Sequence, residues 1–173
     1  MNKAVFFDRD GILNKAIVRD RKPYSPRSVS ELEINKTLLD PMLNLRTNGY
    51  LLFSITNQPD VARGLVSFEL AHAINTQVIE SFPLDDHWLC PHSDRDRCYF
   101  RKPNPGAIER FVGSYDINPE KSFFVGDRWK DIECGERAGC QTILVDYSYD
   151  ESFCAPNIRC KSISELCEIL REL

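Results

Sequence analysis

The most constraining feature of this chain is a set of short, continuous apolar runs separated by segments with helical spacing. The clearest runs of strand length are Ala4–Phe7, Leu51–Ile55, Ser122–Val125 and Thr142–Val145, with a weaker one at His87–Cys90. Because their apolar residues are continuous rather than alternating, these runs are typical of strands covered on both faces. The pattern predicts an α/β fold in which helices sandwich a parallel sheet.

Helix signals occur between and after these runs. The segments are Thr37–Thr47, Ser67–Glu80, one that begins at Pro105, Trp129–Ala138 and Ser162–Leu170. Ser67 is a capping residue type, and Gly139 is a stop signal. Two polar, proline-containing stretches, 16–35 and 91–105, have no such periodicity and are expected to be irregular. The 173 residues therefore predict one domain over 1–173, with functional loops near 15–35 and 90–105.

Composition excludes several classes of protein. A net charge of −4 argues against a broad nucleic-acid surface, so a phosphate site must be a local cluster of cations. No stretch approaches the roughly 18–20 apolar residues of a membrane span, and the first residues lack the pattern of a signal peptide. We expect a cytoplasmic protein with no membrane or nucleic-acid partner. The odd count of 7 cysteines does not suggest a disulfide framework, and we interpret the C-terminal ones as reduced thiols: Cys134, Cys140, Cys154, Cys160 and Cys167.

The carboxyl ends of the predicted strands carry polar motifs. In open α/β sheets, ligands bind at this edge. The first run ends in Asp8-Arg9-Asp10-Gly11, the second in Thr56-Asn57-Gln58 and the third in Gly126-Asp127. Asp146 follows the fourth run without a companion motif and is interpreted as an ordinary strand end.

Asp8 and Asp10 are spaced so that both carboxylates can project to one side, with Arg9 directed elsewhere. Two such charges need a cation, and Mg²⁺ prefers carboxylate and phosphate oxygens. The alternative is that Asp8 caps the next segment and Asp10 belongs to a simple turn. The further carboxylates Asp127 and Asp131, after another strand, favour the metal site.

Thr56 and Lys102 complete a set suited to phosphoryl transfer. Thr56 offers a hydroxyl at a strand end, and Lys102 brings a compact cation before a proline. Each has an ordinary alternative, a turn or cap for the threonine and a solvated charge for the lysine. Together with the carboxylates they provide the positioning and charge neutralisation that phosphoryl transfer needs. A phosphate-binding module without turnover is the alternative of a different class.

These motifs resemble the haloacid dehalogenase (HAD) superfamily of phosphatases. The string Phe6–Asn14 resembles its first motif, Ser54–Gln58 its second, Lys102 its third and Val125–Asp131 its fourth. The resemblance implies a Rossmann-like core without a large cap domain. Within the superfamily, Val61-Ala62-Arg63-Gly64 and Cys90-Pro91-His92 are similar to the branch that acts on heptose bisphosphate and histidinol phosphate.

The resemblance also implies roles for individual residues. Asp8 would attack phosphorus and form an aspartyl-phosphate, while Asp10 would protonate the leaving oxygen and later activate water. Thr56 and Lys102 would hold the transferring phosphoryl group. Magnesium would be held by Asp8, the main-chain carbonyl of Asp10, and Asp127. Further substrate contacts would come from Asn57 and Gln58, and a non-reacting second phosphate would be bound among Arg63, Arg101 and Arg128.

The function that the resemblance implies is Mg²⁺-dependent hydrolysis of the 7-phosphate of D-glycero-D-manno-heptose 1,7-bisphosphate, which supplies heptose for surface polysaccharide such as lipopolysaccharide. The alternative substrate is histidinol phosphate or another small sugar phosphate. We expect the partner to be a small phosphorylated sugar and the protein to be a monomer.

A second metal is also implied, with one departure from the pattern. Such enzymes usually hold a structural zinc with three cysteines and one histidine, and Cys90, His92 and Cys98 match three of these positions. The fourth, two residues after Cys98, is Phe100, which cannot bind a metal.

Two outcomes follow from that departure. Zinc could be completed by water or by a carboxylate such as Asp94 or Asp96, because structural zinc sites are nearly always four-coordinate. Alternatively, the loop holds no zinc and is organised by packing of Tyr99 and Phe100.

Overall fold

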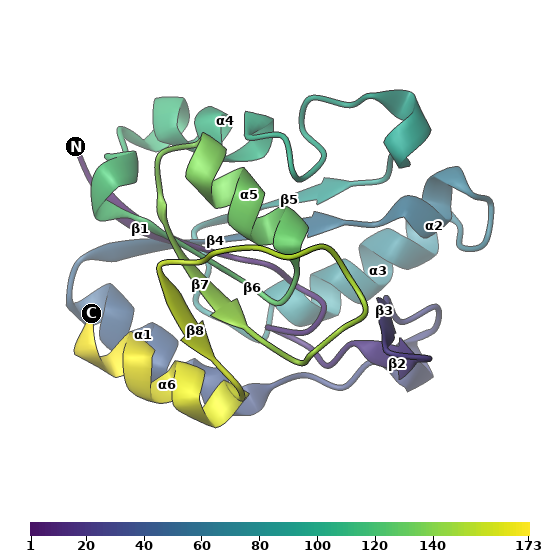
Figure 1. The fold of residues 1–173 in the computed structure, drawn as a ribbon, viewed down its shortest axis with the longest axis horizontal. Helices are drawn as coiled ribbons and strands as arrows, with labels where there is room; N and C mark the ends of the chain where they lie inside the picture. Colours follow the sequence, from purple (N-terminus) through teal and green to yellow (C-terminus); the bar gives the residue numbers. More distant parts are fainter.

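A computed structural model describes residues 1–173 and has a six-stranded parallel sheet at its centre (Figure 1). The strand order is β5-β4-β1-β6-β7-β8, so β1 lies inside the sheet between β4 and β6. The bounds are β1 Lys3–Phe7, β4 Tyr50–Asn57, β5 Asp86–Cys90, β6 Phe123–Gly126, β7 Gln141–Val145 and β8 Ile158–Cys160. The predicted parallel α/β fold is therefore confirmed.

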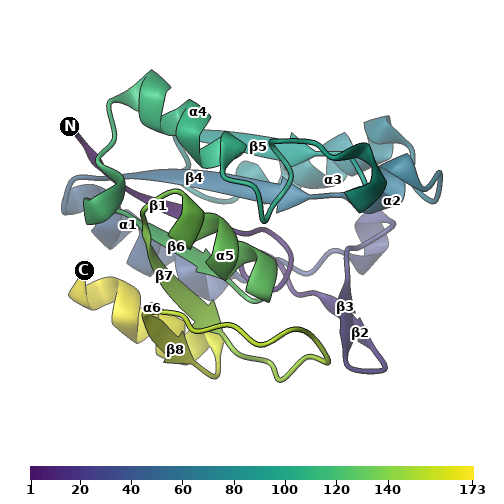
Figure 2. The ribbon, with the colours of Figure 1, turned by 45° about the horizontal axis from the view of Figure 1, so that its top comes forward.

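Helices cover both faces of the sheet in a three-layer arrangement (Figures 1 and 2). Helices α4 and α5 pack on one face, and α1, α3 and α6 pack on the other. No helix combines the length and the apolar character needed to cross a membrane. The bounds are α1 Leu39–Thr47, α2 Pro59–Ala62, α3 Phe68–Ile79, α4 Gly106–Tyr115, α5 Trp129–Arg137 and α6 Ile163–Glu172, with short 3₁₀ turns η1 Val29–Glu31, η2 Lys36–Leu38, η3 Asp94–Asp96 and η4 Pro119–Lys121.

The central strand β1 shows why its apolar run is continuous. Side chains alternate across a strand, so Val5 and Phe7 join the core under α1 and α6. Ala4 and Phe6 join the core under α4 and α5 instead. All four side chains are fully buried. A strand buried on both faces anchors both layers and holds its carboxyl end in a fixed place.

Helix starts follow the predicted capping signals. The Ser67 side chain accepts a hydrogen bond from the Leu70 amide at 3.2 Å, which caps α3. Ser162 caps α6 in the same way. Pro105 differs slightly from the expectation, because it lies at the N-cap and α4 begins at Gly106.

Besides the short 3₁₀ turns, four elements were not predicted. The stretch expected to be irregular at 16–35 contains an antiparallel hairpin of β2 (Ile17–Arg19) and β3 (Lys22–Tyr24). The third strand-like element, β8, and the short helix α2 were also missed. The hairpin has three-residue strands and no apolar run, and Pro23 is tolerated because a two-stranded ribbon leaves one side of each strand unpaired.

Two helical glycines provide a test of the layer spacing. A Cβ added at Gly135 in α5 would lie 2.8 Å from Phe124 Cβ and 2.8 Å from Thr142 Cγ2, so this helix packs closely on β6 and β7. A Cβ at Gly113 in α4 would meet nothing within 4 Å. We expect Gly135→Ala to lower the free energy of unfolding by about 1–3 kcal/mol through overpacking. Gly113→Ala should raise it by about 0.5–1 kcal/mol through helix propensity.

Urea unfolding of both variants would measure these changes. Equal effects of the two substitutions would contradict the close packing of α5 on the sheet.

Candidate functional site

The polar motifs meet at the carboxyl edge of the sheet because their strands are neighbours. Asp8 follows β1, Thr56 lies at the end of β4, and Asp127 follows β6. A pocket of about 350 Å³ opens here, and only 1 of its 18 lining residues is hydrophobic. The residues given a catalytic, metal or substrate role from the sequence that line it are Asp8, Asp10, Asn57, Arg63, Arg101, Lys102 and Arg128, together with the further carboxylates Asp94 and Asp131. Three residues of the predicted phosphatase motifs do not line it and are buried: Thr56, Gln58 and Asp127.

Three buried carboxylates form the base of the site. Oxygen atoms of Asp8, Asp127 and Asp131 all lie within 4.8 Å of one another. Two glycines make room for them. A Cβ at Gly11, where φ is +90°, would lie 1.9 Å from Asp127 Oδ2, and one at Gly126 would lie 2.2 Å from Asp131 Cβ. The glycines of both motifs are thus required by the approach of these acids.

Lys102 is the cation closest to this cluster. Its Nζ donates to Asp8 Oδ1 at 2.6 Å and to the Ile55 carbonyl at 2.8 Å, and lies 2.7 Å from Asp131 Oδ1. Asn57 holds the lysine backbone by donating to its carbonyl and accepting from its amide. Burial lowers the pKa of Lys102, but Asp131 and Asp8 outweigh this effect and raise it, so the lysine stays charged.

The same cluster carries excess negative charge. Burial, and then the charge of Asp131, raise the pKa of Asp8 to about 7, although Lys102 opposes the shift. Burial and the charges of Asp8 and Asp131 raise the pKa of Asp127 well above its usual range, with Tyr149 offsetting part of the shift. Neither Asp127 oxygen has a hydrogen-bond partner of good geometry. Such a set of buried, unsatisfied carboxylate oxygens fits a hard divalent cation.

Asp10 has a different environment from the one expected. The Arg9 side chain was expected to point away from the two carboxylates, and this is wrong: Arg9 is fully buried, and its Nη2 donates to Asp10 at 2.9 and 3.1 Å. A buried guanidinium needs a charged partner, and the adjacent carboxylate is the one available. Asp10 also accepts from Asn14, Ser25 and Gln58. Burial raises the pKa of Asp10, but Arg9 and these hydrogen bonds outweigh it and lower the pKa.

Gln58 connects the second motif to the first. Its Nε2 donates to Thr56 Oγ1 at 2.8 Å and to Asp10 Oδ2 at 2.8 Å. The hydroxyl of Thr56 accepts this bond and can still donate its own hydrogen. The second motif therefore supports Asp10 as well as offering a hydroxyl near the pocket.

The arginines proposed for a second phosphate all reach the pocket, but each has a carboxylate partner. The pairs are Arg63 with Asp60, Arg101 with Asp94 and Arg128 with Glu151. Arg101 is buried, with a relative exposure of 6%, and its Nη1 has no hydrogen-bond partner. Arg128 likewise has a buried Nε without a partner, so Arg101 and Arg128 both keep a buried donor for a ligand.

Several pocket residues were given no individual function from the sequence. Asp131, named only as a further carboxylate beside Asp127, accepts from the Arg128 amide and contacts Lys102. The hairpin contributes Lys22 and Tyr24, and the segment after β7 contributes Asp150 and Glu151. These loops are joined where the Asp150 amide donates to the Arg21 carbonyl at 2.9 Å. No sequence motif marks this contact.

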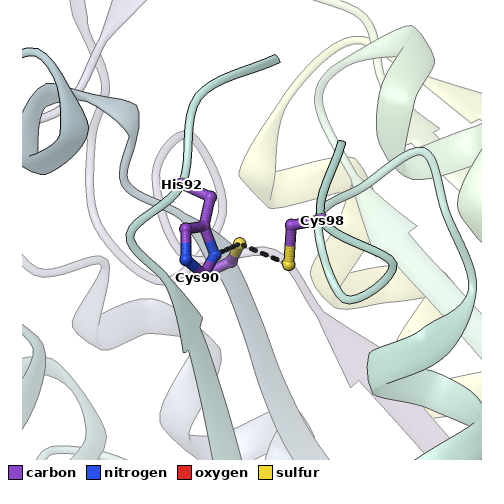
Figure 3. Close-up of side chains that lie close together, drawn as sticks. All are labelled: Cys90, His92 and Cys98. Atoms are coloured by element: carbon purple, nitrogen blue, oxygen red, sulfur yellow. Dashed lines mark hydrogen bonds between the residues drawn. The ribbon is translucent and has the colours of Figure 1, made fainter. Parts of the chain in front are cut away.

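The predicted metal loop brings three donors together (Figure 3). The donor atoms of Cys90, His92 and Cys98 lie within 4.8 Å of one another, and the two sulfurs are 3.9 Å apart. Phe100, at the fourth position, packs its ring on Trp88 with centroids 4.8 Å apart.

Neither carboxylate expected to complete the zinc site is free to do so. Asp96 accepts from the amide and hydroxyl of Ser93. Asp94 accepts from Arg101 and from Lys130. The residues present do not form a closed four-ligand zinc site.

Comparison with proteins of known name places the chain among phosphatases. A family model described as HAD-hydrolase-like matches residues 99–151. A D-glycero-beta-D-manno-heptose-1,7-bisphosphate 7-phosphatase of Helicobacter pylori is 30% identical over 98% of both chains. A D-glycero-D-manno-heptose-1,7-bisphosphate 7-phosphatase of Chlorobaculum tepidum is 31% identical over 88% of this chain and 83% of its own. A D-glycero-alpha-D-manno-heptose-1,7-bisphosphate 7-phosphatase of Photorhabdus laumondii is 33% identical over 79% of this chain and 78% of its own.

A solved structure agrees with these relatives. The D,D-heptose 1,7-bisphosphate phosphatase of B. bronchiseptica, complexed with magnesium and phosphate, superposes with a TM-score of 0.80 at 25% identity, covering 98% of each chain. Near full-length similarity of this kind shows the family. The chain belongs to the heptose-1,7-bisphosphate 7-phosphatase family of HAD-like hydrolases.

Proposed function

We propose that this protein is a magnesium-dependent phosphatase that removes the 7-phosphate of D-glycero-D-manno-heptose 1,7-bisphosphate. The observation that carries the proposal is Asp8 at the end of the central strand, in contact with Lys102 and within one cluster with Asp127. A carboxylate nucleophile, a fixed cation and further acids at the floor of a polar pocket are what phosphoryl transfer requires. The names of the family members supply the substrate.

Asp8 is the proposed nucleophile. One of its oxygens attacks phosphorus, the bond to the sugar oxygen breaks, and an aspartyl-phosphate forms. Lys102, which already contacts Asp8, neutralises charge on the phosphoryl group as it is transferred. The Thr56 hydroxyl donates a hydrogen bond to a phosphoryl oxygen.

Asp10 is the proposed acid and base. It protonates the leaving sugar oxygen and then takes a proton from the water that hydrolyses the aspartyl-phosphate. Its lowered pKa suits the second step, because the carboxylate is ionised when the pocket is empty. The first step needs a proton, so substrate must change the surroundings of Asp10, where Ser25 is its one partner from the hairpin side of the pocket.

Magnesium would be held by Asp8, Asp127 and the main-chain carbonyl of Asp10. The unsatisfied oxygens of Asp127 support this assignment, whereas Asp131 is already engaged by Lys102 and the Arg128 amide. When bound, the ion supplies the positive charge that the carboxylate cluster lacks.

Binding of the phosphate that does not react is assigned to cations away from Asp8. Arg63, Arg101 and Arg128 line the pocket with Lys102, and Arg101 retains a free buried donor. Asn57 and Gln58 shape the same wall, mainly through their bonds to Lys102 and Asp10. We propose that the whole chain, 1–173, acts as one phosphatase domain. Because all these groups come from one chain, we also propose that it acts as a monomer.

Steady-state assays would test the substrate. Phosphate release should be fastest with one anomer of the heptose 1,7-bisphosphate and far slower with histidinol phosphate. Comparable or greater kcat/KM on histidinol phosphate would overturn the proposed substrate while leaving the phosphatase chemistry in place.

Asp8→Asn should reduce phosphate release from an aryl phosphate by at least about 10³-fold, because an amide cannot form the covalent intermediate. Asp146→Asn is the matched control, since Asp146 also follows a parallel strand of the sheet but contacts Arg159 outside the pocket. The control should keep activity within about twofold of the wild type. Residual turnover in Asp8→Asn near the wild-type rate would exclude Asp8 as the nucleophile.

Arg101→Ala should raise the KM for the bisphosphate by about tenfold or more and change the KM for an aryl monophosphate much less, because only the former has a second phosphate. Arg95→Ala removes an exposed arginine of the same loop that does not line the pocket. Equal changes of KM on both substrates would remove the second-phosphate assignment.

Asp127→Asn should stabilise the metal-free protein and abolish stabilisation by magnesium. The pKa of Asp127 is raised on folding, so the native state keeps a proton that the unfolded state releases above its ordinary pKa of 3.8. The free energy of unfolding therefore falls as pH rises above that value, and the amide avoids this loss. Thermal and urea unfolding at pH 6 and pH 8 without metal should show the variant more stable than the wild type, and by more at the higher pH.

Added magnesium should stabilise the wild type, and more at the higher pH, because the ion binds ionised carboxylates. Equal stabilisation of the variant by magnesium would rule out Asp127 as a ligand.

A further inference from the structure

One carboxylate oxygen at the rim of the pocket holds two cations from different parts of the chain. Asp94, in the short turn η3, accepts through Oδ1 from Arg101 Nε at 3.0 Å and from Lys130 Nζ at 2.9 Å. Lys130 lies in the first turn of α5, whereas Arg101 lies in the loop before α4. All three residues line the pocket. Asp94 therefore ties the loop between β5 and α4 to a helix of the core.

Arg101 and Lys130 can still bind an anion while they are paired with Asp94. Two positive charges share one carboxylate, so the group as a whole is cationic. The buried Nη1 of Arg101 has no partner and belongs to a side chain facing the pocket. Asp94 itself is 62% exposed, so water screens its attraction and a phosphate dianion can compete for the same donors. Hydrogen bonds from Lys130 and Arg101 lower the pKa of Asp94 to about 2, which keeps it ionised.

The loop that carries Asp94 offers three metal donors rather than the four of a closed zinc site. Only Cys90, His92 and Cys98 offer donors there, and the ring of Phe100 packs on Trp88 instead. The remaining restraint within η3 is the reciprocal hydrogen bonding of Ser93 and Asp96. The ion pair of Asp94 with Lys130 thus links the η3 part of this loop to α5, whereas the later part is linked through Lys102 with Asp131 and through the bonds from Arg137.

We propose that Asp94 is a positioning residue: it fixes Arg101 and Lys130 as a paired cation site for a substrate phosphate remote from Asp8. The ion pairs of Asp94 and the Phe100–Trp88 contact, rather than zinc, hold the loop in place. The proposal rests on the proposed function for its substrate, a sugar bisphosphate. Without Asp94, the like charges of Arg101 and Lys130 repel, and the lysine is free to extend into solvent. An anion would then have to order both side chains as it binds.

The test is the inhibition constant of a sugar bisphosphate against hydrolysis of an aryl phosphate. Asp94→Ala should weaken inhibition by about tenfold and raise the KM for the aryl phosphate much less, because that substrate has no second phosphate. Asp94→Asn keeps an acceptor oxygen but loses the charge, so its inhibition constant should lie between those of the wild type and Asp94→Ala. Asp96→Asn removes the same charge from the same turn without touching Arg101 or Lys130, and should change the constant by less than about twofold.

Several outcomes would overturn the proposal. An Asp94→Ala protein with unchanged or tighter inhibition would show that Asp94 does not position the cations. Equal effects of Asp94→Ala and Asp96→Asn would reduce the role to general loop structure. Because the readout needs only aryl phosphate turnover, it remains informative if the heptose bisphosphate proves not to be the substrate.

The zinc arm uses metal content and thermal unfolding. Untagged protein treated with a zinc-selective chelator should keep its melting temperature and the inhibition constant of the sugar bisphosphate. A stoichiometric zinc ion whose removal lowers the melting temperature, or weakens inhibition as Asp94→Ala does, would show that metal holds the loop and would overturn that part of the proposal.

Discussion

The buried contact of Lys102 with Asp8 and Asp131 is the interaction on which the site depends. It joins the end of β1 to the loop before α4 and to the first turn of α5, so three distant parts of the chain meet at one ammonium group. One lysine cannot neutralise the cluster, because Asp127 adds a third carboxylate whose oxygens lack partners. Three carboxylates face one ammonium group, and burial makes this deficit of positive charge costly. A divalent cation would relieve it.

The part of the pocket that contains Arg63, Arg101 and Arg128 has a different arrangement of charges. There each arginine has a carboxylate partner, and those partners come from α2, from η3 and from the segment after β7 rather than from strands. Pairing keeps the cations in place when the pocket is empty and leaves donors such as Arg101 Nη1 for a ligand. A ligand with more negative charge than a carboxylate competes best for such donors, which favours a phosphate group over other anions.

Much of this could be predicted from the sequence. The continuous apolar runs at β1, β4, β6 and β7 indicated a sheet buried on both faces, and the capping residue type of Ser67 indicated where α3 begins. The motif at each strand end was sufficient to bring Asp8, Thr56 and Asp127 to one edge, since parallel neighbouring strands end together. The hairpin β2–β3 was not predictable in this way, because its short strands carry no periodic signal.

The sequence by itself determined the layer architecture and the identity of the strand-end carboxylates, because both depend on local periodicity and on residues adjacent in the chain. Only the tertiary structure decided which charge meets which. Arg9 is paired with Asp10, and Asp94 is paired with both Arg101 and Lys130. The ring of Phe100 packs on Trp88 and not on the cysteines. These choices depend on which partners burial brings within a few ångströms, and residues far apart in the chain carry no local pattern that records them.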